Sequence, residues 1–458
     1  MLQMITNPAT LAPLGEVLES DSDAVERAVA AARSAAGVWR TTPVVRRAEL
    51  LKVIADRIRA QAQNLAELST RESGLAQCES LDSVRAAAAC FDYCSTQRGA
   101  SLEGNRRVEP ECAVAAVLVP FDLPLLVMAA GVARALAAGI CVVCKPPVRN
   151  PLSCLALARA FDGLPDGAVT TVTGGASVGR ALVAHPVIGD VLFTGSRASA
   201  SEWAGTQGGK HFHLEVGTVD AQIVCRDADL DLTVPAVAWT RLMCGGKSRM
   251  SGGHLYVERS LAREFVDRLH QCVGFLDVDD PGKPSTDLGP LLSLEAAREL
   301  EDQVGRTLRA GAKLILGGRR FRPSGLPGHF FQPTILTDVG AGSVPMRERL
   351  LGPVITVTPV ADLAEALRLW AEFSPRTSPP VAAIYTADTS AAGCAVQASA
   401  EGTFRINDPS VRALGPFSGL HHSGIRYALG ADLKQLETAV AIERKPWWFP
   451  YADRARSL

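Results

Sequence analysis

Apolar residues recur at helical spacing through the first hundred residues of the chain. Residues 22–36 carry acidic side chains early, apolar side chains one helical turn apart and Gly37 at the end, which together predict a helix. The same period follows Pro43 and predicts a second helix over 44–68. Helical character continues to about Cys94. The pattern therefore predicts a mainly helical N-terminal portion.

After residue 113 short runs that are apolar throughout alternate with amphipathic segments. Strands, or strands with a following turn, are expected over 113–119, 140–145, 168–175 and 190–196. Fully apolar strands separated by helices are typical of a parallel sheet that is covered on both faces. A second α/β series begins near Asp229. The pattern predicts an α/β protein with two domains.

Composition narrows the class of protein. A chain of 458 residues is too long for one hydrophobic core, and a net charge of -1 gives no electrostatic reason to expect nucleic acid or membrane as a partner. We see no signal peptide and no apolar run that could cross a bilayer. The 11 cysteines then indicate reduced thiols and a cytoplasmic protein. Cys141 and Cys144 form a CxxC inside an expected strand, which points them to opposite faces, so no metal site is expected.

Ligands of parallel sheets bind at the carboxyl ends of the strands, so the turns after the strands are the places to search. Lys145 leaves its strand beside two prolines and could reach a ribose or a phosphate. Gly195 and Ser196 form a strand-to-helix turn whose backbone N–H groups could face a phosphate. The segment "VTGGASVG" is not a GxGxxG fingerprint. Each of these signals is weak when taken alone.

Ten short segments, taken in order, resemble the motif series of the aldehyde dehydrogenase superfamily. They run from roughly residue 20 to the C-terminus and are "VPFDLPL", "CKPP", "HPVIGDVLFTGS", "HLEVG", "RDADLD", "LGPLLS", "HFFQPTIL", "LLGPVITV", "FRIND" and "PFSGLHHSGIR". The resemblance implies a Rossmann-type NAD(P)-binding domain and an α/β catalytic domain. It also implies an oligomerisation element, made from a hairpin and the C-terminal strand. The NAD(P)-binding-like domain is expected over 1–96 and 113–228, and the catalytic-like domain over 229–405. The oligomerisation element is expected over 97–112 and 437–458.

Members of this family attack the aldehyde carbonyl with a cysteine thiolate, which is a strong nucleophile and later a good leaving group. Their Asn-x-Gly-Gln-x-Cys segment resembles "CGGKSR" here, and the downstream "HLYV" fixes the register. The nucleophile's position then falls on Arg249, which stays protonated and cannot attack a carbonyl. The nearest thiol, Cys244, takes the place of the asparagine. It could enter the site only if the loop were redrawn.

Two further residues match positions that the family uses in catalysis. Asp122 replaces the asparagine whose amide stabilises the oxyanion, and a carboxylate would repel that charge. Because an unpaired charge in a cleft is costly, we expect Asp122 to pair with Arg249, the alternative being two unrelated solvent-facing charges. Glu215 corresponds to the family's general base. It either keeps an acid–base role or pairs with Arg249 or Lys247.

The resemblance also assigns cofactor positions, and only some of them are retained. Lys145, Gly195 and Ser196 match, and Arg197 lies within the same turn. The carboxylate that usually follows the lysine is Val148, and the one that grips the nicotinamide-side ribose is Arg349. We therefore expect NAD or NADP to bind weakly, through its phosphates, or not at all. The two arginines leave a different phosphorylated ligand open.

Three functions remain open at this stage. The leading hypothesis is an aldehyde dehydrogenase-fold protein without the thiol nucleophile, acting as a pseudoenzyme and partner subunit or as a repurposed enzyme. The second is an NAD(P)-dependent aldehyde dehydrogenase that uses a relocated cysteine such as Cys244. The third is a purely structural oligomer. A homodimer or homotetramer is expected, or a heteromer with an active relative, and the small-molecule ligand is unknown.

Overall fold

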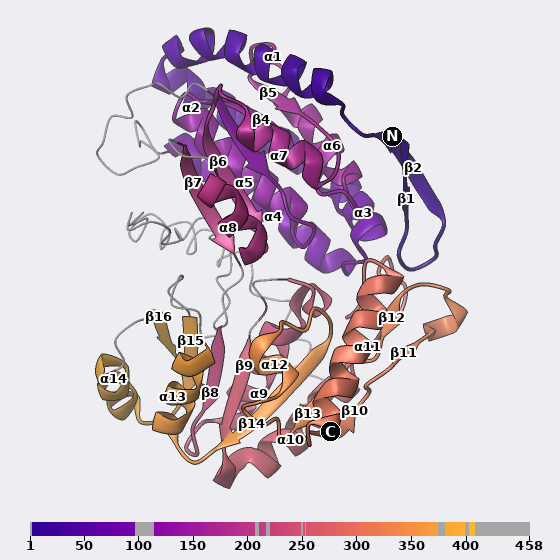
Figure 1. Cartoon of the computed structure of the whole chain (residues 1–458), viewed down its shortest axis with the longest axis vertical. Helices are drawn as coiled ribbons and strands as arrows, with labels where there is room; N and C mark the ends of the chain where they lie inside the picture. Colours follow the sequence, from indigo (N-terminus) through magenta and orange to yellow (C-terminus); the bar gives the residue numbers. More distant parts are fainter. Residues whose placement is uncertain are drawn as a thin grey trace.

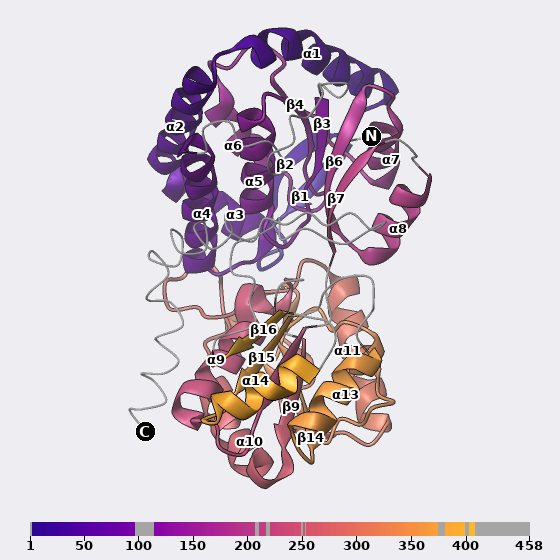
Figure 2. The same ribbon diagram turned by 90° about the vertical axis from the view of Figure 1, so that its left-hand side faces the viewer.

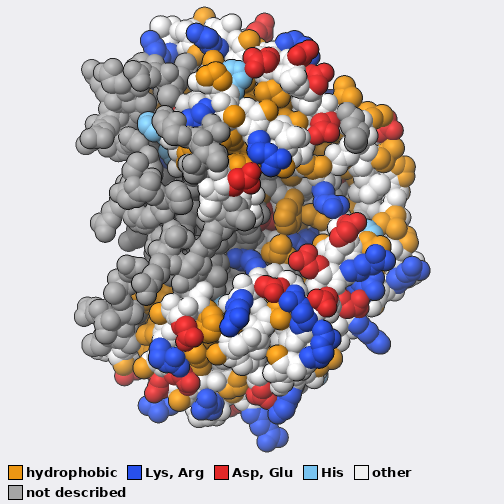
Figure 3. Space-filling view, in the orientation of Figure 1, with side chains coloured by type: hydrophobic (Ala, Val, Ile, Leu, Met, Phe, Trp, Pro, Cys, Tyr) orange, Lys and Arg blue, Asp and Glu red, His pale blue; other side chains and the backbone are white. Residues whose placement is uncertain are grey.

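The computed structural model describes residues 2–96, 114–206, 210–216, 220–248, 251, 253–373, 381–398 and 403–407. Figure 1 shows two bodies, one above the other, each built around a sheet with helices packed on it. The surface between them is hollowed, and charged side chains of both signs gather over the lower body beside it (Figure 3). In the described part of the chain, no helix is long and apolar enough to span a membrane.

Four helices precede the strands of the upper body in the sequence: α1 (Ser22–Thr41), α2 (Val44–Ala60), α3 (Ala62–Ser73) and α4 (Gln77–Thr96). The helix predicted over 22–36 is present and begins where the Asp21 carboxylate accepts the Ala24 N–H at 2.7 Å. The predicted end at Gly37 is wrong, because α1 continues through this glycine to Thr41. The single helix predicted over 44–68 is wrong. Gln61 leaves helical geometry at φ -107° and ψ 10° and separates α2 from α3. The apolar period runs on across this break, so it does not reveal the change of direction.

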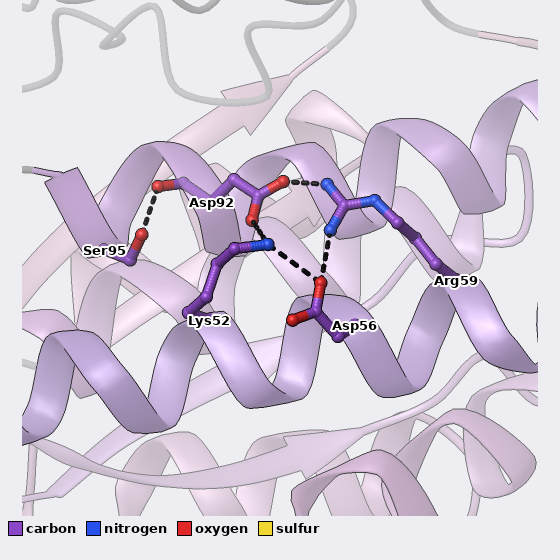
Figure 4. A network of polar contacts seen from close by, with 5 residues as sticks. All are labelled: Lys52, Asp56, Arg59, Asp92 and Ser95. Carbon is purple, nitrogen blue, oxygen red and sulfur yellow. Dashed lines mark hydrogen bonds and ion pairs between the residues drawn. The ribbon is translucent and has the colours of Figure 1, made fainter.

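Exposed charges on α2 and α4 join these two helices (Figure 4). The Lys52 ammonium lies 2.8 Å from the Asp56 carboxylate and 3.3 Å from that of Asp92. Arg59 bridges the same two carboxylates, and the Ser95 hydroxyl donates to the Asp92 carbonyl at 2.6 Å. Water screens such pairs, so the buried apolar faces of the helices contribute more to packing than these charges do.

The upper sheet has five parallel strands in the order β5-β4-β3-β6-β7. They are β3 (Val114–Leu118), β4 (Cys141–Lys145), β5 (Val169–Thr171), β6 (Ile188–Gly195) and β7 (His211–Val216). The helices between them are α5 (Pro124–Ala137), α6 (Leu152–Ala158), α7 (Ala176–Ala184) and α8 (Arg197–Thr206). Figure 2 shows α2, α4 and α5 to one side of this sheet and α7 and α8 to the other. The prediction of a parallel sheet covered on both faces is confirmed.

The lower sheet has seven strands in the order β10-β13-β14-β9-β8-β15-β16, and only the β10–β13 pair is antiparallel. They are β8 (Ala221–Val224), β9 (His254–Glu258), β10 (Lys313–Leu316), β13 (Thr334–Thr337), β14 (Val354–Val360), β15 (Val381–Tyr385) and β16 (Thr403–Ile406). The helices are α9 (Leu230–Leu242), α10 (Arg259–Gly274), α11 (Leu294–Arg309), α12 (Val344–Arg347), α13 (Leu363–Phe373) and α14 (Thr389–Ala398). Since β8 pairs with β9 and β15, the domain boundary expected at residue 228 lies too late.

Two small antiparallel sheets complete the described part of the fold. One is a hairpin of β1 (Leu2–Thr6) and β2 (Pro13–Leu18), and the other pairs β11 (Arg320–Phe321) with β12 (Phe330–Phe331). The hairpin contacts both bodies. Gln3 donates to the Val148 carbonyl at 3.0 Å in the upper body, and the His329 N–H donates to the Pro8 carbonyl at 3.0 Å in the lower one. The segments 97–112 and 437–458, assigned above to oligomerisation, lie outside the described residues.

A buried carboxylate fixes the loop that follows β4. Glu72, at the end of α3, accepts the N–H groups of Leu152 at 2.7 Å and Ser153 at 2.8 Å, and also the Ser153 hydroxyl. These are donors of the first turn of α6, which a helix cannot satisfy by itself. Burial raises the pKa of Glu72 to about 7, against the opposing effect of these hydrogen bonds. Glu72 thus fixes the end of the loop where α6 begins.

Candidate functional site

The turn that precedes the expected nucleophile position is forced into an unusual backbone. It follows α9, and Cys244, Gly245 and Gly246 have φ angles of 54°, 63° and 67°. L-residues other than glycine rarely adopt such angles. The Gly246 carbonyl accepts the Gly352 N–H at 3.0 Å, and a Cβ on Gly246 would lie 2.0 Å from the Gly352 oxygen. The turn therefore approaches the start of β14 so closely that only glycine fits.

Lys247 holds this turn against both bodies. Its ammonium donates to the carbonyls of Ser73 at 3.1 Å and Gly74 at 3.0 Å in the upper body, and to that of Pro290 at 2.7 Å in the lower one. The side chain is buried, and burial lowers the pKa of Lys247. From α4 the buried Glu79 carboxylate accepts the Cys244 N–H at 2.6 Å, and burial raises the pKa of Glu79. The turn is positioned by buried charges on both sides.

Eight described thiols have raised pKa values, and Cys244 is buried in the turn. Cys244 is 3% exposed, and its backbone is fixed by Glu79 and by the left-handed turn. Burial raises the pKa of the other described cysteines, which are Cys78, Cys90, Cys94, Cys141, Cys144, Cys154, Cys225 and Cys272. A catalytic cysteine instead needs a lowered pKa or a neighbouring base. Cys141 and Cys144 are both buried on β4, in keeping with a structural role.

Asp122 lies at the same turn, as the sequence predicts. It follows β3, its side chain is 5% exposed, and its carboxylate accepts the hydroxyl of buried Ser248 at 3.2 Å. Burial excludes the alternative of a solvent-facing aspartate. Arg249 lies outside the described residues, so its pairing with Asp122 stays a prediction. Asp122 is nevertheless hydrogen-bonded to the residue directly before it.

Arg349 contacts this turn from the lower body. Its guanidinium donates to the carbonyls of Ser251 at 2.6 Å and Ser248 at 3.3 Å. Arg241, buried on α9, donates to the Leu350 carbonyl at 2.6 Å, and burial followed by the charge of Arg349 lowers its pKa to about 9. Burial, Arg349 and Arg241 together lower the pKa of His254 to about 4. Arg349 stands at the position where the family's ribose acceptor was expected to be lost. Its hydrogen bonds to Ser248 and Ser251 support the backbone of the turn.

The cofactor positions of the upper sheet lie at the carboxyl ends of β4 and β6. Lys145 donates to the Pro146 carbonyl at 3.1 Å, and burial, which Glu19 opposes, lowers its pKa to about 8. Gly195 ends β6, and the Ser196 hydroxyl accepts the Ser199 N–H at 3.1 Å in the first turn of α8. A Cβ on Gly179 would lie 3.6 Å from the Lys145 side chain. These residues lie at the carboxyl ends of the strands, which is the edge where parallel sheets bind nucleotides.

Other predicted site residues are placed by the backbone alone. Glu215 lies on β7 opposite Thr194 of β6, and Arg197 begins α8; nothing is described of either side chain. Three residues of the site were not assigned a role from the sequence: Glu79, Arg241 and Glu19. Glu79 and Glu19 lie in helical or loop segments far along the chain from the motifs. No local signal marked them.

The chain matches the model of the Aldehyde dehydrogenase family over residues 3–439, and it belongs to that family. The fold predicted from the resemblance is confirmed. The chain is 32% identical over 445 residues to the 3,6-anhydro-alpha-L-galactose dehydrogenase of Streptomyces coelicolor, covering 93% of this chain and 89% of the relative. It is 34% identical to the NADP(+) succinate-semialdehyde dehydrogenase of Deinococcus radiodurans, covering 87% and 85%.

Solved structures agree with this assignment. The NADP-dependent glyceraldehyde-3-phosphate dehydrogenase of Bacillus halodurans, complexed with NADP, superposes with a TM-score of 0.83 at 26% identity, over 90% of this chain and 88% of that one. A putative aldehyde dehydrogenase from Burkholderia cenocepacia gives a TM-score of 0.86 at 27% identity, over 95% and 92%. The chain thus has the family's oxidoreductase architecture and its NAD(P)-binding fold.

Proposed function

We propose that this chain is an aldehyde dehydrogenase-family protein that does not carry out thiol-dependent aldehyde oxidation. Its cleft would serve ligand binding, partner assembly or chemistry that needs no thiol. The observation that carries the proposal is the framework of the turn at 244–248. Buried Asp122 and the guanidinium of Arg349 contact the backbone or side chains around the position where the family has its nucleophile, and the sequence has Arg249 there.

The geometry of Cys244 argues against a relocated nucleophile. Bringing its thiol into the cleft would require the turn to change shape. That change would break the hydrogen bond between Glu79 and the Cys244 N–H and would disturb the contact between Gly246 and Gly352. Each lost buried hydrogen bond leaves a desolvated group without a partner, which costs about 1–3 kcal/mol. A conformational change of the turn that brings the Cys244 thiol into the cleft is therefore energetically unfavourable.

The alternative is a working NAD(P)-dependent aldehyde dehydrogenase that uses Cys244. The comparisons favour this alternative, because the curated relatives named above are dehydrogenases. The retained Lys145, Gly195 and Ser196 are also consistent with it. A purely structural oligomer is the third candidate, and ligand binding in the cleft would exclude it.

We expect no NAD(P)-dependent oxidation of succinate semialdehyde, glyceraldehyde 3-phosphate or simple aliphatic and aromatic aldehydes, and no esterase activity. Losing the nucleophile and the oxyanion donor should each lower the rate by roughly two or more orders of magnitude. The assay follows nicotinamide reduction with the full-length protein. Turnover that disappears in Cys244→Ala, but persists in the matched buried control Cys272→Ala, would overturn this proposal in favour of the alternative.

The site retains family residues on the adenosine and phosphate side of the cofactor but not on the nicotinamide side. We propose that any dinucleotide is held through its adenosine and phosphates at Lys145, Gly195 and Ser196, with Arg197 close in sequence. Arg349 has donors and no acceptor, so it cannot accept hydrogen bonds from the nicotinamide-side ribose hydroxyls, and its Nη2 already donates to two carbonyls. Calorimetry should give weak or undetectable NAD+ binding. A micromolar dissociation constant together with an ordered nicotinamide would contradict this expectation.

Assembly remains a separate proposal. A homodimer or homotetramer, or a heteromer with an active relative, would use the segments 97–112 and 437–458, which lie outside the described residues. The apolar alternation of "ETAVAIERK" still favours a strand that needs a neighbouring sheet. A full-length protein that sediments as a monomer at micromolar concentration would exclude all of these assemblies.

A further inference from the structure

The segment that joins the hairpin to α1 lies against the residues that follow β5. The Ser20 N–H donates to the Thr173 carbonyl at 2.8 Å, and the Thr173 N–H donates back to the Ser20 hydroxyl at 3.0 Å. These two hydrogen bonds fix the backbone of both segments. Glu19, between the hairpin and Ser20, is thereby placed opposite the glycines of "VTGGASVG".

The Glu19 carboxylate is seated on this glycine pair. One of its oxygens accepts the Gly175 N–H at 3.2 Å. A Cβ on Gly174 would lie 2.8 Å from the Glu19 Cγ and 3.0 Å from the same oxygen. Gly174 has a φ of 140°, so both its backbone and its missing side chain are needed. The side chain of Glu19 therefore has a defined place and is not a freely moving surface charge.

Glu19 also stands near the lysine of the cofactor edge. A Cβ on Gly174 would lie 2.8 Å from the Glu19 Cγ and 2.6 Å from Val178, and Val178 directly precedes Gly179, which the Lys145 side chain approaches. The negative charge of Glu19 opposes the lowering of the Lys145 pKa by burial. Both residues lie beside the start of α7, since the Lys145 side chain approaches Gly179 of that helix. A carboxylate and an ammonium thus lie together at the carboxyl ends of β4 and β5. This is the edge where parallel sheets bind nucleotides.

We propose that Glu19 is the residue that selects the adenosine ribose, accepting a ribose hydroxyl and excluding a 2′-phosphate. The inference rests on the adenosine-side binding proposed above. Val148, which has no acceptor in its side chain, leaves this role unfilled on the β4 loop. A carboxylate hydrogen-bonds a free 2′-hydroxyl and repels a phosphate at the same atom. Together with Lys145 it makes the edge complementary to NAD rather than to NADP.

The test compares two probes that differ only in the 2′-phosphate: adenosine 5′-monophosphate and adenosine 2′,5′-bisphosphate. Calorimetry on the full-length wild type should give tighter binding of the monophosphate by about tenfold, the ratio that one electrostatic contact of moderate strength produces. Glu19→Gln keeps an oxygen for the Gly175 N–H but removes the charge, so it should abolish this preference. Glu16→Gln, an exposed change on β2, is the matched control and should leave the ratio unchanged.

An unchanged ratio in Glu19→Gln would overturn the proposal, as would a wild type that prefers the bisphosphate. Absence of binding of both probes at millimolar concentration would overturn it too, because the edge would then hold no adenosine. None of these outcomes bears on the loss of thiol chemistry, which the aldehyde assay tests separately. The two proposals can therefore fail independently.

Discussion

Replacing Lys247 with methionine should lower the free energy of unfolding by about 3–5 kcal/mol. Methionine has nearly the same length, so the change removes the charge and its donors with little loss of volume. Three buried carbonyl oxygens, of Ser73, Gly74 and Pro290, would lose their donor. The buried Glu79 carboxylate would lose the positive charge that offsets its burial.

Urea unfolding at neutral pH measures this loss, and Lys52→Met is the matched control. Lys52 makes ion pairs of similar length on the exposed surface of α2, where water replaces a lost partner. Its loss should change stability by less than about 1 kcal/mol. Similar losses for both variants would show that the contacts of Lys247 do not hold the two bodies together.

Replacing Gly246 with alanine should cost about 3 kcal/mol or more, since two separate penalties add. A Cβ would lie 2.0 Å from the Gly352 oxygen and 2.5 Å from its carbonyl carbon, so β14 or the turn must shift. The φ of 67° adds the strain of a left-handed backbone. The same shift would move Lys247 and Ser248, so the framework of the turn should loosen as well.

Gly37→Ala is the opposite case and serves as the control. It lies inside α1, and a Cβ there meets nothing within 4 Å. Alanine is the better helix former, so this variant should gain about 0.5–1 kcal/mol. Thermal or urea unfolding of both variants gives the comparison. A Gly246→Ala protein as stable as the wild type would contradict the close approach of the turn to β14.

The sequence predicted those parts of the fold whose signal is local. Apolar runs marked β3, β4 and β6, and early acidic residues followed by an apolar helical period marked α1. The break at Gln61 escaped prediction because α2 and α3 bury faces of the same period on either side of it. The hairpin β1–β2 was missed since its strands are short and half-exposed.

The site was predictable only where a motif could be aligned. Asp122 was expected to pair with Arg249; its carboxylate accepts a hydrogen bond from Ser248, the residue directly before Arg249, and the pairing itself stays a prediction. Glu79 and Lys247 each contact residues that are far away in the sequence. The residues next to either of them in the sequence give no signal of these contacts. Arg349 was expected to weaken a cofactor contact, whereas its hydrogen bonds to Ser248 and Ser251 give it a structural role that depends on three-dimensional proximity.

The hairpin that contacts both bodies sets an order on folding during synthesis. Gln3 contacts Val148 and Pro8 contacts His329, so the hairpin leaves the ribosome before either partner and gains its last contact only after residue 329 has emerged. Until then, the lower body cannot fold completely, and the hairpin presents the exposed side chains of Leu2, Met4 and Leu18. Such late, long-range contacts slow folding and lengthen the period in which chaperones can engage the nascent protein.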